Sequence, residues 1–314
     1  MCIRDRSYWV YQHLGNLSPR ELDDDPVYRR IAAGEDAGPM VRELAERSDR
    51  DVGAMRWSFY RDLGMTRLVV IDSRAGRILD EQQRRMLNEA EWDYVERHCD
   101  GDFDHLLLAT SVPFLLAPGM HHLEQWNERV CAGAWGGLAA RAAEWIRQAI
   151  DLEHWAAFDR SFRELAELER AVASGERGRP PATVITLSGD VHHAYVYEVA
   201  FPSNGHGTGA AERAAVYQAV CSPMRNALSS KERRMIRFGW SKPFAAVARA
   251  MARAAGARDP EIRWRPVDGQ KPWFNNQLAT LELDGRSAQM RLERPKPGDP
   301  GPPQLEQLAE RRLA

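Results

Sequence analysis

Residues 183–193 read TVITLSGDVHH and join a short apolar run to a turn of polar side chains. The run 183–187 is rich in β-branched residues and is followed by Ser188-Gly189, which is typical of a buried strand that ends in a tight turn. Two similar runs come earlier, residues 66–71 (TRLVVI) and 105–109 (HLLLA), with helical periodicity over residues 80–97 between them. Strand, helix and strand at this spacing predict an α/β fold with a parallel sheet.

Further strands are predicted after this turn. Residues 194–201 (AYVYEVAF) alternate in polarity, and the Gly-rich stretch 204–209 forms a hairpin-like turn into residues 214–221 (AAVYQAVC). An alternating run, a glycine-rich turn and a second apolar run indicate two antiparallel strands.

The C-terminal part carries the strongest hairpin signal in the chain. Residues 277–283 and 287–293 flank Asp284-Gly285, a dipeptide that favours the tight turn between two strands. Beyond Arg294 the sequence is rich in proline and glycine and then helix-prone. We therefore predict a flexible tail over residues 294–314.

Composition excludes several classes of protein. The formal net charge of the 314 residues is -2, which gives no overall attraction to nucleic acid or to an anionic membrane. No window approaches the ~18 apolar residues of a membrane span, and the N-terminus lacks the apolar core of a signal peptide. We predict no nucleic-acid partner, no integral membrane segment and a cytoplasmic location, unless an export signal precedes the chain. Oligomeric state is open.

The four cysteines give no sign of a structural zinc site, because none of them forms a C-x-x-C pair. They are Cys2, Cys99, Cys131 and Cys221. Free thiols or small buried side chains are the expected roles.

The turn at residues 188–193 carries the sharpest chemical signal. Ligands of open α/β sheets bind beyond the carboxyl ends of the strands, which is where this turn lies. Asp190 and His192 occupy alternate positions of the turn and are candidate metal ligands, since carboxylate and neutral imidazole suit zinc, iron and manganese. The alternative is a turn carboxylate beside two hydrogen-bonded histidines, His192 and His193.

The segment LSGDVHHAYV (residues 187–196) resembles the last metal-binding motif of the PhoD-like (alkaline phosphatase D type) phosphatases, which belong to the calcineurin-like metallophosphoesterase superfamily. Further blocks resemble the same family in the same order. They are YWVYQHLGNLSP (8–19), VIDSR (70–74), LLATSVPF (107–114), HHLEQWNE (121–128), YQAVCSPMRN (217–226) and PWFNNQLATLEL (272–283).

The resemblance implies an αββα sandwich and the hydrolysis of a small phosphate monoester or diester. It implies two metal ions, of Fe, Mn, Zn or Ca, that activate a water for in-line attack. Asp190 and His192 match the metal ligands of the final motif, and His193 is a neighbouring catalytic residue that faces the phosphate or supports a ligand.

Arg74 is a candidate catalytic residue because a guanidinium can bind phosphate with two hydrogen bonds. Arg225 could do the same. The alternative for each arginine is a surface ion pair.

The sequence departs from the family pattern in its first half. The other metal-binding motifs of the family are missing, and one turn cannot supply the roughly six ligands that two metals need. We therefore expect residues 7–293 to be the C-terminal part of a metallophosphatase domain, residues 1–6 to be a non-native leader, and activity to be weak or absent. The alternative is a non-catalytic binding or scaffold module that retains the fold. Serine hydrolysis through Ser111 is disfavoured because no Gly-x-Ser-x-Gly motif surrounds it.

The end of the sheet at which a polar residue lies indicates whether it can belong to a ligand-binding site. Asp72, Thr110 and Ser111 follow strands and belong at the ligand-binding end, whereas the acidic stretch 100–105 precedes a strand and is expected to be a solvated turn.

Two further segments are open between two interpretations. His121, His122 and Glu124 either line a substrate entrance or have a structural role. The basic, partly amphipathic stretch 231–265 either rests on a membrane surface or polyanion or forms a solvated helix face.

Overall fold

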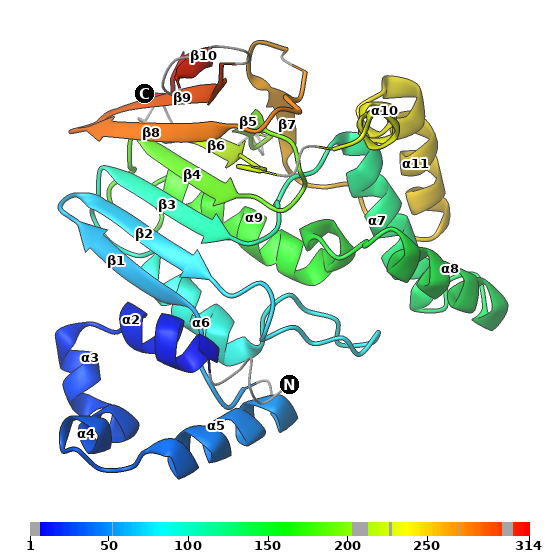
Figure 1. Cartoon of the computed structure of the whole chain (residues 1–314). Coiled ribbons are helices and arrows are strands. Elements are labelled where there is room, and N and C mark those ends of the chain that lie inside the picture. Colours follow the sequence, from blue (N-terminus) through cyan, green and yellow to red (C-terminus); the bar gives the residue numbers. More distant parts are fainter. Residues whose placement is uncertain (1–6, 52, 203–212, 226–227, 270, 297–303) are drawn as a thin grey trace.

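The computed structural model of the chain describes residues 7–51, 53–202, 213–225, 228–269, 271–296 and 304–314 (Figure 1). Its strands are β1 (Phe59–Leu63), β2 (Thr66–Ile71), β3 (His105–Thr110), β4 (Thr183–Ser188), β5 (Tyr195–Ala200), β6 (Ala215–Val220), β7 (Arg263–Pro266), β8 (Leu278–Asp284), β9 (Ser287–Pro295) and β10 (Leu305–Arg312). Its helices are η1 (Trp9–His13), α2 (Leu14–Asn16), α3 (Pro19–Asp24), α4 (Pro26–Ala32), α5 (Gly38–Arg50), α6 (Glu89–His98), α7 (Pro118–Cys131), α8 (Gly137–Ala149), η2 (Trp155–Ala157), α9 (Asp159–Ala173), α10 (Ser230–Gly239), α11 (Lys242–Ala254) and η3 (Val267–Gly269).

A mixed sheet forms the centre of the molecule, with strand order β1-β2-β3-β4-β6-β5-β7. Strands β2, β3, β4 and β6 are parallel to one another, which confirms the predicted α/β class. Their carboxyl ends therefore share one edge of the sheet, and the loops that follow β2, β3 and β4 meet there.

The two faces of this sheet are covered differently. One face packs on α6 and α9 through buried side chains such as Val69, Leu106 and Val184. The other face packs on a second, antiparallel sheet, β10-β9-β8, where Ile185 and Met290 belong to one apolar cluster. The core is thus a central mixed sheet flanked by helices and backed by a second sheet (Figure 1).

The second helical layer of the expected αββα sandwich is not formed by the described part of the chain. Strand β9 turns Ala288, Met290 and Leu292 inward, while Gln289 and Arg291 between them face outward. These outward residues bond or pair with side chains of the same sheet, Glu310 and Glu282. A polar outer face of this kind is the surface of a half-buried sheet.

Two predicted elements differ from the structure. The helix expected over residues 80–97 begins at Glu89, because the Asn88 side chain accepts a hydrogen bond from the Glu91 N–H and so caps it. The helix-prone tail contains strand β10, which pairs with β9 from Leu305↔Pro295 to Arg312↔Gln289.

The expected leader (1–6) and the Gly-rich turn (204–209) lie outside the described residues. Strands β5 and β6 on either side of that turn are antiparallel, as predicted.

Candidate functional site

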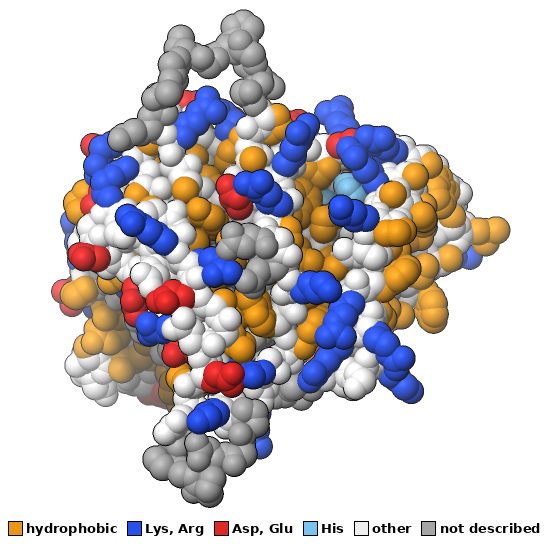
Figure 2. Space-filling model, turned by 90° about the horizontal axis from the view of Figure 1, so that it is seen from above, with side chains coloured by type: hydrophobic (Ala, Val, Ile, Leu, Met, Phe, Trp, Pro, Cys, Tyr) orange, Lys and Arg blue, Asp and Glu red, His pale blue; other side chains and the backbone are white. Residues whose placement is uncertain are grey.

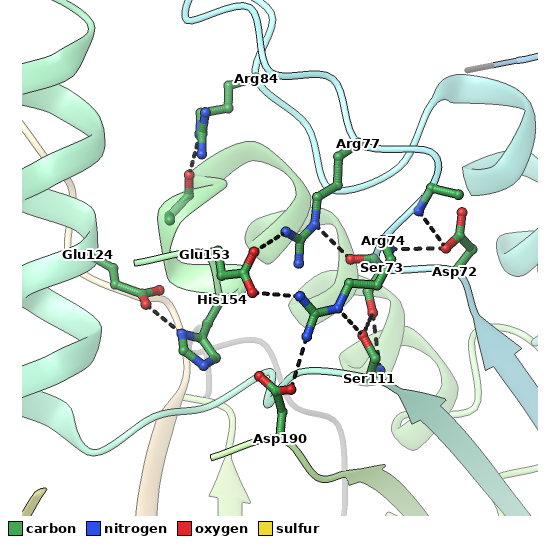
Figure 3. Close-up of polar contacts among 12 residues, drawn as sticks. Asp72, Ser73, Arg74, Arg77, Arg84, Ser111, Glu124, Glu153, His154 and Asp190 are labelled. Carbon is green, nitrogen blue, oxygen red and sulfur yellow. Dashed lines mark hydrogen bonds and ion pairs between the residues drawn. The ribbon is translucent and has the colours of Figure 1, made fainter. Parts of the chain in front are cut away.

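The loop after β2 is shaped by Asp72. Its carboxylate accepts hydrogen bonds from the backbone N–H groups of Arg74, Ala75 and Gly76, at 3.0, 2.9 and 2.8 Å. An acidic side chain that binds its own following backbone in this way fixes a tight turn. Asp72 therefore positions the loop, and Arg74 extends from it over the edge of the sheet (Figure 3).

Two serines join the ends of β2 and β3. The hydroxyl oxygens of Ser73 and Ser111 lie 2.7 Å apart, and the Ser111 N–H donates to Ser73 Oγ at 3.1 Å. The Nε–H of Arg74 donates to Ser111 Oγ at 3.1 Å. The hydroxyl of Ser111 is thus part of a polar network with Ser73 and Arg74.

Arg74 is the centre of this strand-end cluster, which we define as Ser73, Arg74, Ser111, Glu153 and Asp190. Its Nη1 donates to Glu153 at 2.5 Å, and its Nη2 donates to Asp190 at 3.0 Å (Figure 3). A planar guanidinium suits this role because it presents donors in several fixed directions. One side chain therefore connects the loops after β2, β3 and β4 with the segment before η2.

Glu153 receives a second guanidinium. Arg77 Nη1 donates to its other carboxylate oxygen at 2.7 Å. Partial burial of Glu153 opposes ionisation, but Arg77 and Arg74 outweigh that effect and hold the pKa of its carboxyl below the usual value. Glu153 is therefore an anion at neutral pH.

The turn after β4 has an unusual backbone. Asp190 and His192 have φ angles of 73° and 55°, in the left-handed region that side chains other than glycine seldom adopt. The turn is held against the end of β6, where the His192 N–H donates to Ser222 Oγ at 2.9 Å. This conformation costs on the order of 1 kcal/mol or more per residue and recurs at functional sites.

His193 lies among aromatic rings. Its Nδ1 donates to the Val191 carbonyl at 2.6 Å, and its ring lies near those of Phe274, Tyr195 and Trp240, at centroid distances of 5.7, 5.2 and 6.4 Å. Burial lowers the pKa of His193 to about 4. The ring is therefore neutral at physiological pH, and its catalytic role stays a prediction.

A buried carboxylate and an imidazole flank the cluster. Glu124 on α7 is fully buried and accepts a hydrogen bond from His154 Nδ1 at 2.7 Å. Burial disfavours the charge on His154, but Glu124 outweighs burial and raises the pKa of the imidazole. Figure 3 shows the imidazole between Glu124 and Asp190.

The histidines at the start of α7 do not form an entrance. His121 is buried among rings that include Phe162 and Trp264, and His122 bonds to Gln125. Glu124 therefore faces the site, whereas His121 and His122 have the structural role that was the alternative prediction.

Sequence reasoning singled out Asp190 and Arg74, and the structure brings them into contact. It missed the roles of Arg77, Glu153 and His154. The only local signal for the last two was their position directly before the buried Trp155.

The opposite end of the sheet agrees with the prediction of an acidic turn. The stretch 100–105 precedes β3, and Asp100 and Asp104 pair with Arg177 and Arg179, both at 2.8 Å. His105 is buried and contacts Thr183. This end is a network of ion pairs, far from the strand-end cluster in the fold.

The described residues do not fit the two metal ions that the resemblance implies. Among them, no group of three or more His, Cys, Asp and Glu side chains lies close enough together to hold a metal ion. The carboxylate of Asp190, the first candidate ligand, forms an ion pair with Arg74. The ligand assignments of Asp190 and His192 therefore stay predictions.

Two cavities of about 750 Å³ each flank Arg74. One is lined by the ends of β2 and β3 with Ser73 and Ser111, and by η1 and α2. The other is lined by Arg77, Arg84 and Glu153. Each is of the size that accommodates a small-molecule ligand.

No protein-family model and no curated protein matches the chain. A solved structure described as "Structure of PhoD" matches with a TM-score of 0.42 and 10% identity, over 83% of this chain and 44% of that one. The chain therefore spans less than half the length of that protein, and similarity at this level defines neither a family nor an activity.

Proposed function

We propose that the chain hydrolyses phosphate monoesters or diesters, with the phosphate bound at Arg74 in the strand-end cluster. The observation that supports this most is the position of the guanidinium. It lies at the carboxyl edge of the parallel strands, between two cavities, in the loop after β2, and it contacts the loops that follow β3 and β4. Guanidinium groups match phosphate oxygens with paired hydrogen bonds.

The residues around Arg74 supply the other requirements of the reaction. A phosphate oxygen that takes the place of Asp190 on Arg74 releases the Asp190 carboxylate, which can then accept a proton from the attacking water. Water forms the new P–O bond as the ester P–O bond breaks, and the departing oxygen takes a proton. His154 is the proposed donor of that proton, because Glu124 favours its protonated form.

The finer form of the proposal, a dinuclear metal centre of the metallophosphoesterase type, rests on the resemblance of the turn 187–196. The described residues do not form its ligand set, so no step of the reaction is assigned to a metal.

Turnover of p-nitrophenyl phosphate and of bis(p-nitrophenyl) phosphate tests the proposal, without added metal and with Mn, Fe, Ca or Zn. Arg74→Lys keeps the charge and loses the planar fork, so we expect kcat/KM to fall by about tenfold or more. Arg179→Lys is the matched control, since Arg179 pairs with Asp104 at the other end of the sheet. Absence of turnover under every condition would reject hydrolysis.

A non-catalytic module that binds phosphate esters is the second candidate. It is favoured by the ion pair between Arg74 and Asp190 and by the incomplete metal-ligand set of the described residues. Calorimetry with a phosphate ester distinguishes the two candidates. If the chain is a binding module, the ester binds the wild type, binds Arg74→Lys more weakly, and is not hydrolysed by either.

A further inference from the structure

The outward face of α8 is apolar. Leu138 and Trp145 are 83% and 71% exposed, although both are large hydrophobic side chains. With Ala142 and Ala149 they are spaced by four, three and four residues, so they form one stripe along the helix. Such a stripe normally packs against another element, and here it is exposed.

The outward face of α11 has the same character. Ala248 and Ala252 are buried on the inner side, in contact with the α7 side of the molecule. The outer side exposes Ala246, Val247 and Ala250. Both helices pack on α7, so each has an apolar inner face and a second apolar face toward solvent.

Helix α10 adds aromatic and basic side chains. Met235 and Phe238 are exposed on it. Between Ser230 and Ala254, which covers α10 and α11, the sequence has seven Lys and Arg residues and one acidic residue, Glu232. Glu232 is occupied as the partner of the N-terminal cap Ser229. Arg249 and Arg253 pair with Asp259, which leaves a basic group formed by Lys231, Arg233, Arg234, Arg237 and Lys242.

Apolar and basic groups gather on the same side of the molecule. Figure 1 places α8, α10 and α11 on this side, away from the two sheets, with α7 and α11 between α10 and α8. Figure 2 shows hydrophobic side chains at the same end, bordered by Lys and Arg. We define the α8–α10–α11 surface as the outward faces of these three helices.

We propose that the α8–α10–α11 surface binds the headgroup region of an anionic lipid bilayer. Charge complementarity decides for this partner, because the exposed Met235, Phe238 and Val247 of α10 and α11 belong to a segment with seven Lys and Arg residues and one acidic residue. Leu138 and Trp145 of α8 add exposed apolar area. Tryptophan is favoured at the boundary of water and hydrocarbon. The helices have 10 to 13 residues, and within the described part of the chain none is long and apolar enough to cross a membrane, so the surface lies on the bilayer.

Co-sedimentation with lipid vesicles tests the proposal. We expect the chain to bind vesicles made of equal parts of phosphatidylcholine and phosphatidylglycerol at least about tenfold more tightly than vesicles of phosphatidylcholine alone, and added salt to weaken binding. Trp145 fluorescence is expected to shift to the blue on binding, and this component of the shift is expected to be lost in Trp145→Phe.

Paired substitutions separate the apolar and the basic contributions. Leu138→Ser with Trp145→Ser, and separately Lys231→Glu with Arg234→Glu, are each expected to reduce binding by about tenfold or more. The matched controls are Leu63→Ser with Met65→Ser, exposed hydrophobic residues beside the β1–β2 turn, and Arg42→Glu with Arg47→Glu on α5. All of these positions are exposed, and circular dichroism checks that each variant folds.

Three results would overturn the proposal. The first is equal binding to neutral and anionic vesicles, or no binding. The second is a control pair that reduces binding as much as the α8–α10–α11 variants do. The third is a dimer in light scattering that Leu138→Ser with Trp145→Ser dissociates, which would assign the surface to a second copy of the chain. None of these depends on phosphatase activity.

Discussion

Glu169 is a buried acid that the candidate site does not use. It lies on α9 with about 1% of its surface exposed, and one carboxylate oxygen accepts a hydrogen bond from Thr186 on β4. Burial raises the pKa of Glu169 to about 8, against the weaker lowering effect of Thr186. The side chain is therefore largely protonated in the folded protein at neutral pH.

The raised pKa of Glu169 predicts a pH dependence of stability. Below the pKa of Glu169 in the unfolded chain, near 4.5, the side chain is protonated in both the folded and the unfolded state and does not change the free energy of unfolding. Between there and about pH 8 the unfolded state ionises first, so the free energy of unfolding falls by up to ~1.4 kcal/mol for each step of one in pH. Glu169→Gln is expected to flatten this fall, as measured by urea unfolding at a series of pH values.

Glu167→Gln is the control on the same helix. Glu167 is exposed and pairs with Arg170 at 2.6 Å, and exposed ion pairs contribute little to stability. If Glu167→Gln and Glu169→Gln had the same pH profile, the buried acid would not be the cause of the slope.

At the residue scale, the sequence predicted the site only in part. Asp190 carries a local signal, the glycine-containing turn after β4, and Arg74 was chosen for its guanidinium, which can bind phosphate. The partner Glu153 carries none, because it is 79 residues from Arg74 in the chain and meets it only when α7, α8 and η2 are in place. Contacts between distant residues cannot be inferred from local spacing.

At the scale of elements, apolar segments of sequence predicted the strands correctly, whereas strands with charged sequences were missed. Strand β2 was predicted at its observed bounds, and β3 and β4 within a residue, because buried parallel strands are continuous hydrophobic segments. Strand β1 (FYRDL) and strand β10 (LEQLAERR) were missed. The sequence of β10 favours a helix by propensity, and it is a strand because the edge of β9 is available to pair with it.

Helix α7 approaches α10 and α11 closely at Gly119. A Cβ added to Gly119 would lie 2.4 Å from Phe244 Cδ1 and 2.6 Å from the carbonyl oxygen of Gly239. One of these contacts is with backbone, which cannot rotate away. Gly119→Ala is therefore expected to lower the free energy of unfolding by about 1–3 kcal/mol, as measured by urea denaturation.

Gly137 gives the matched comparison, since it also lies in the first turn of a helix and nothing lies within 4 Å of an added Cβ. Gly137→Ala is expected to leave stability unchanged or raise it by about 0.5–1 kcal/mol. A loss of stability for Gly137→Ala as large as that for Gly119→Ala would show that close packing is not the reason.

At the scale of the whole molecule, the parallel pairing of β2, β3 and β4 follows from the alternation of strand and helix, whereas the second sheet requires residues 305–312. The sequence predicted the hairpin of β8 and β9 but not that its third strand comes from residues 305–312. The charged side chains of β10 lie on the surface, so only a few residues at this end of the chain contribute apolar side chains to the core.

Leu313 is the position that ties the end of the chain to the core. Its N–H donates to the Ala288 carbonyl at 2.8 Å, and its buried side chain belongs to the apolar cluster between the two sheets, with Leu107 and Ile185 of the central sheet. Leu313→Ala is expected to cost about 2–5 kcal/mol, because it removes buried methyl groups and leaves a cavity between the sheets. Leu305→Ala, at the exposed start of β10, is expected to cost less than about 0.5 kcal/mol. Thermal unfolding of the two variants measures the difference; equal and small losses would mean that the end of the chain is a loosely held tail, as the sequence alone suggested.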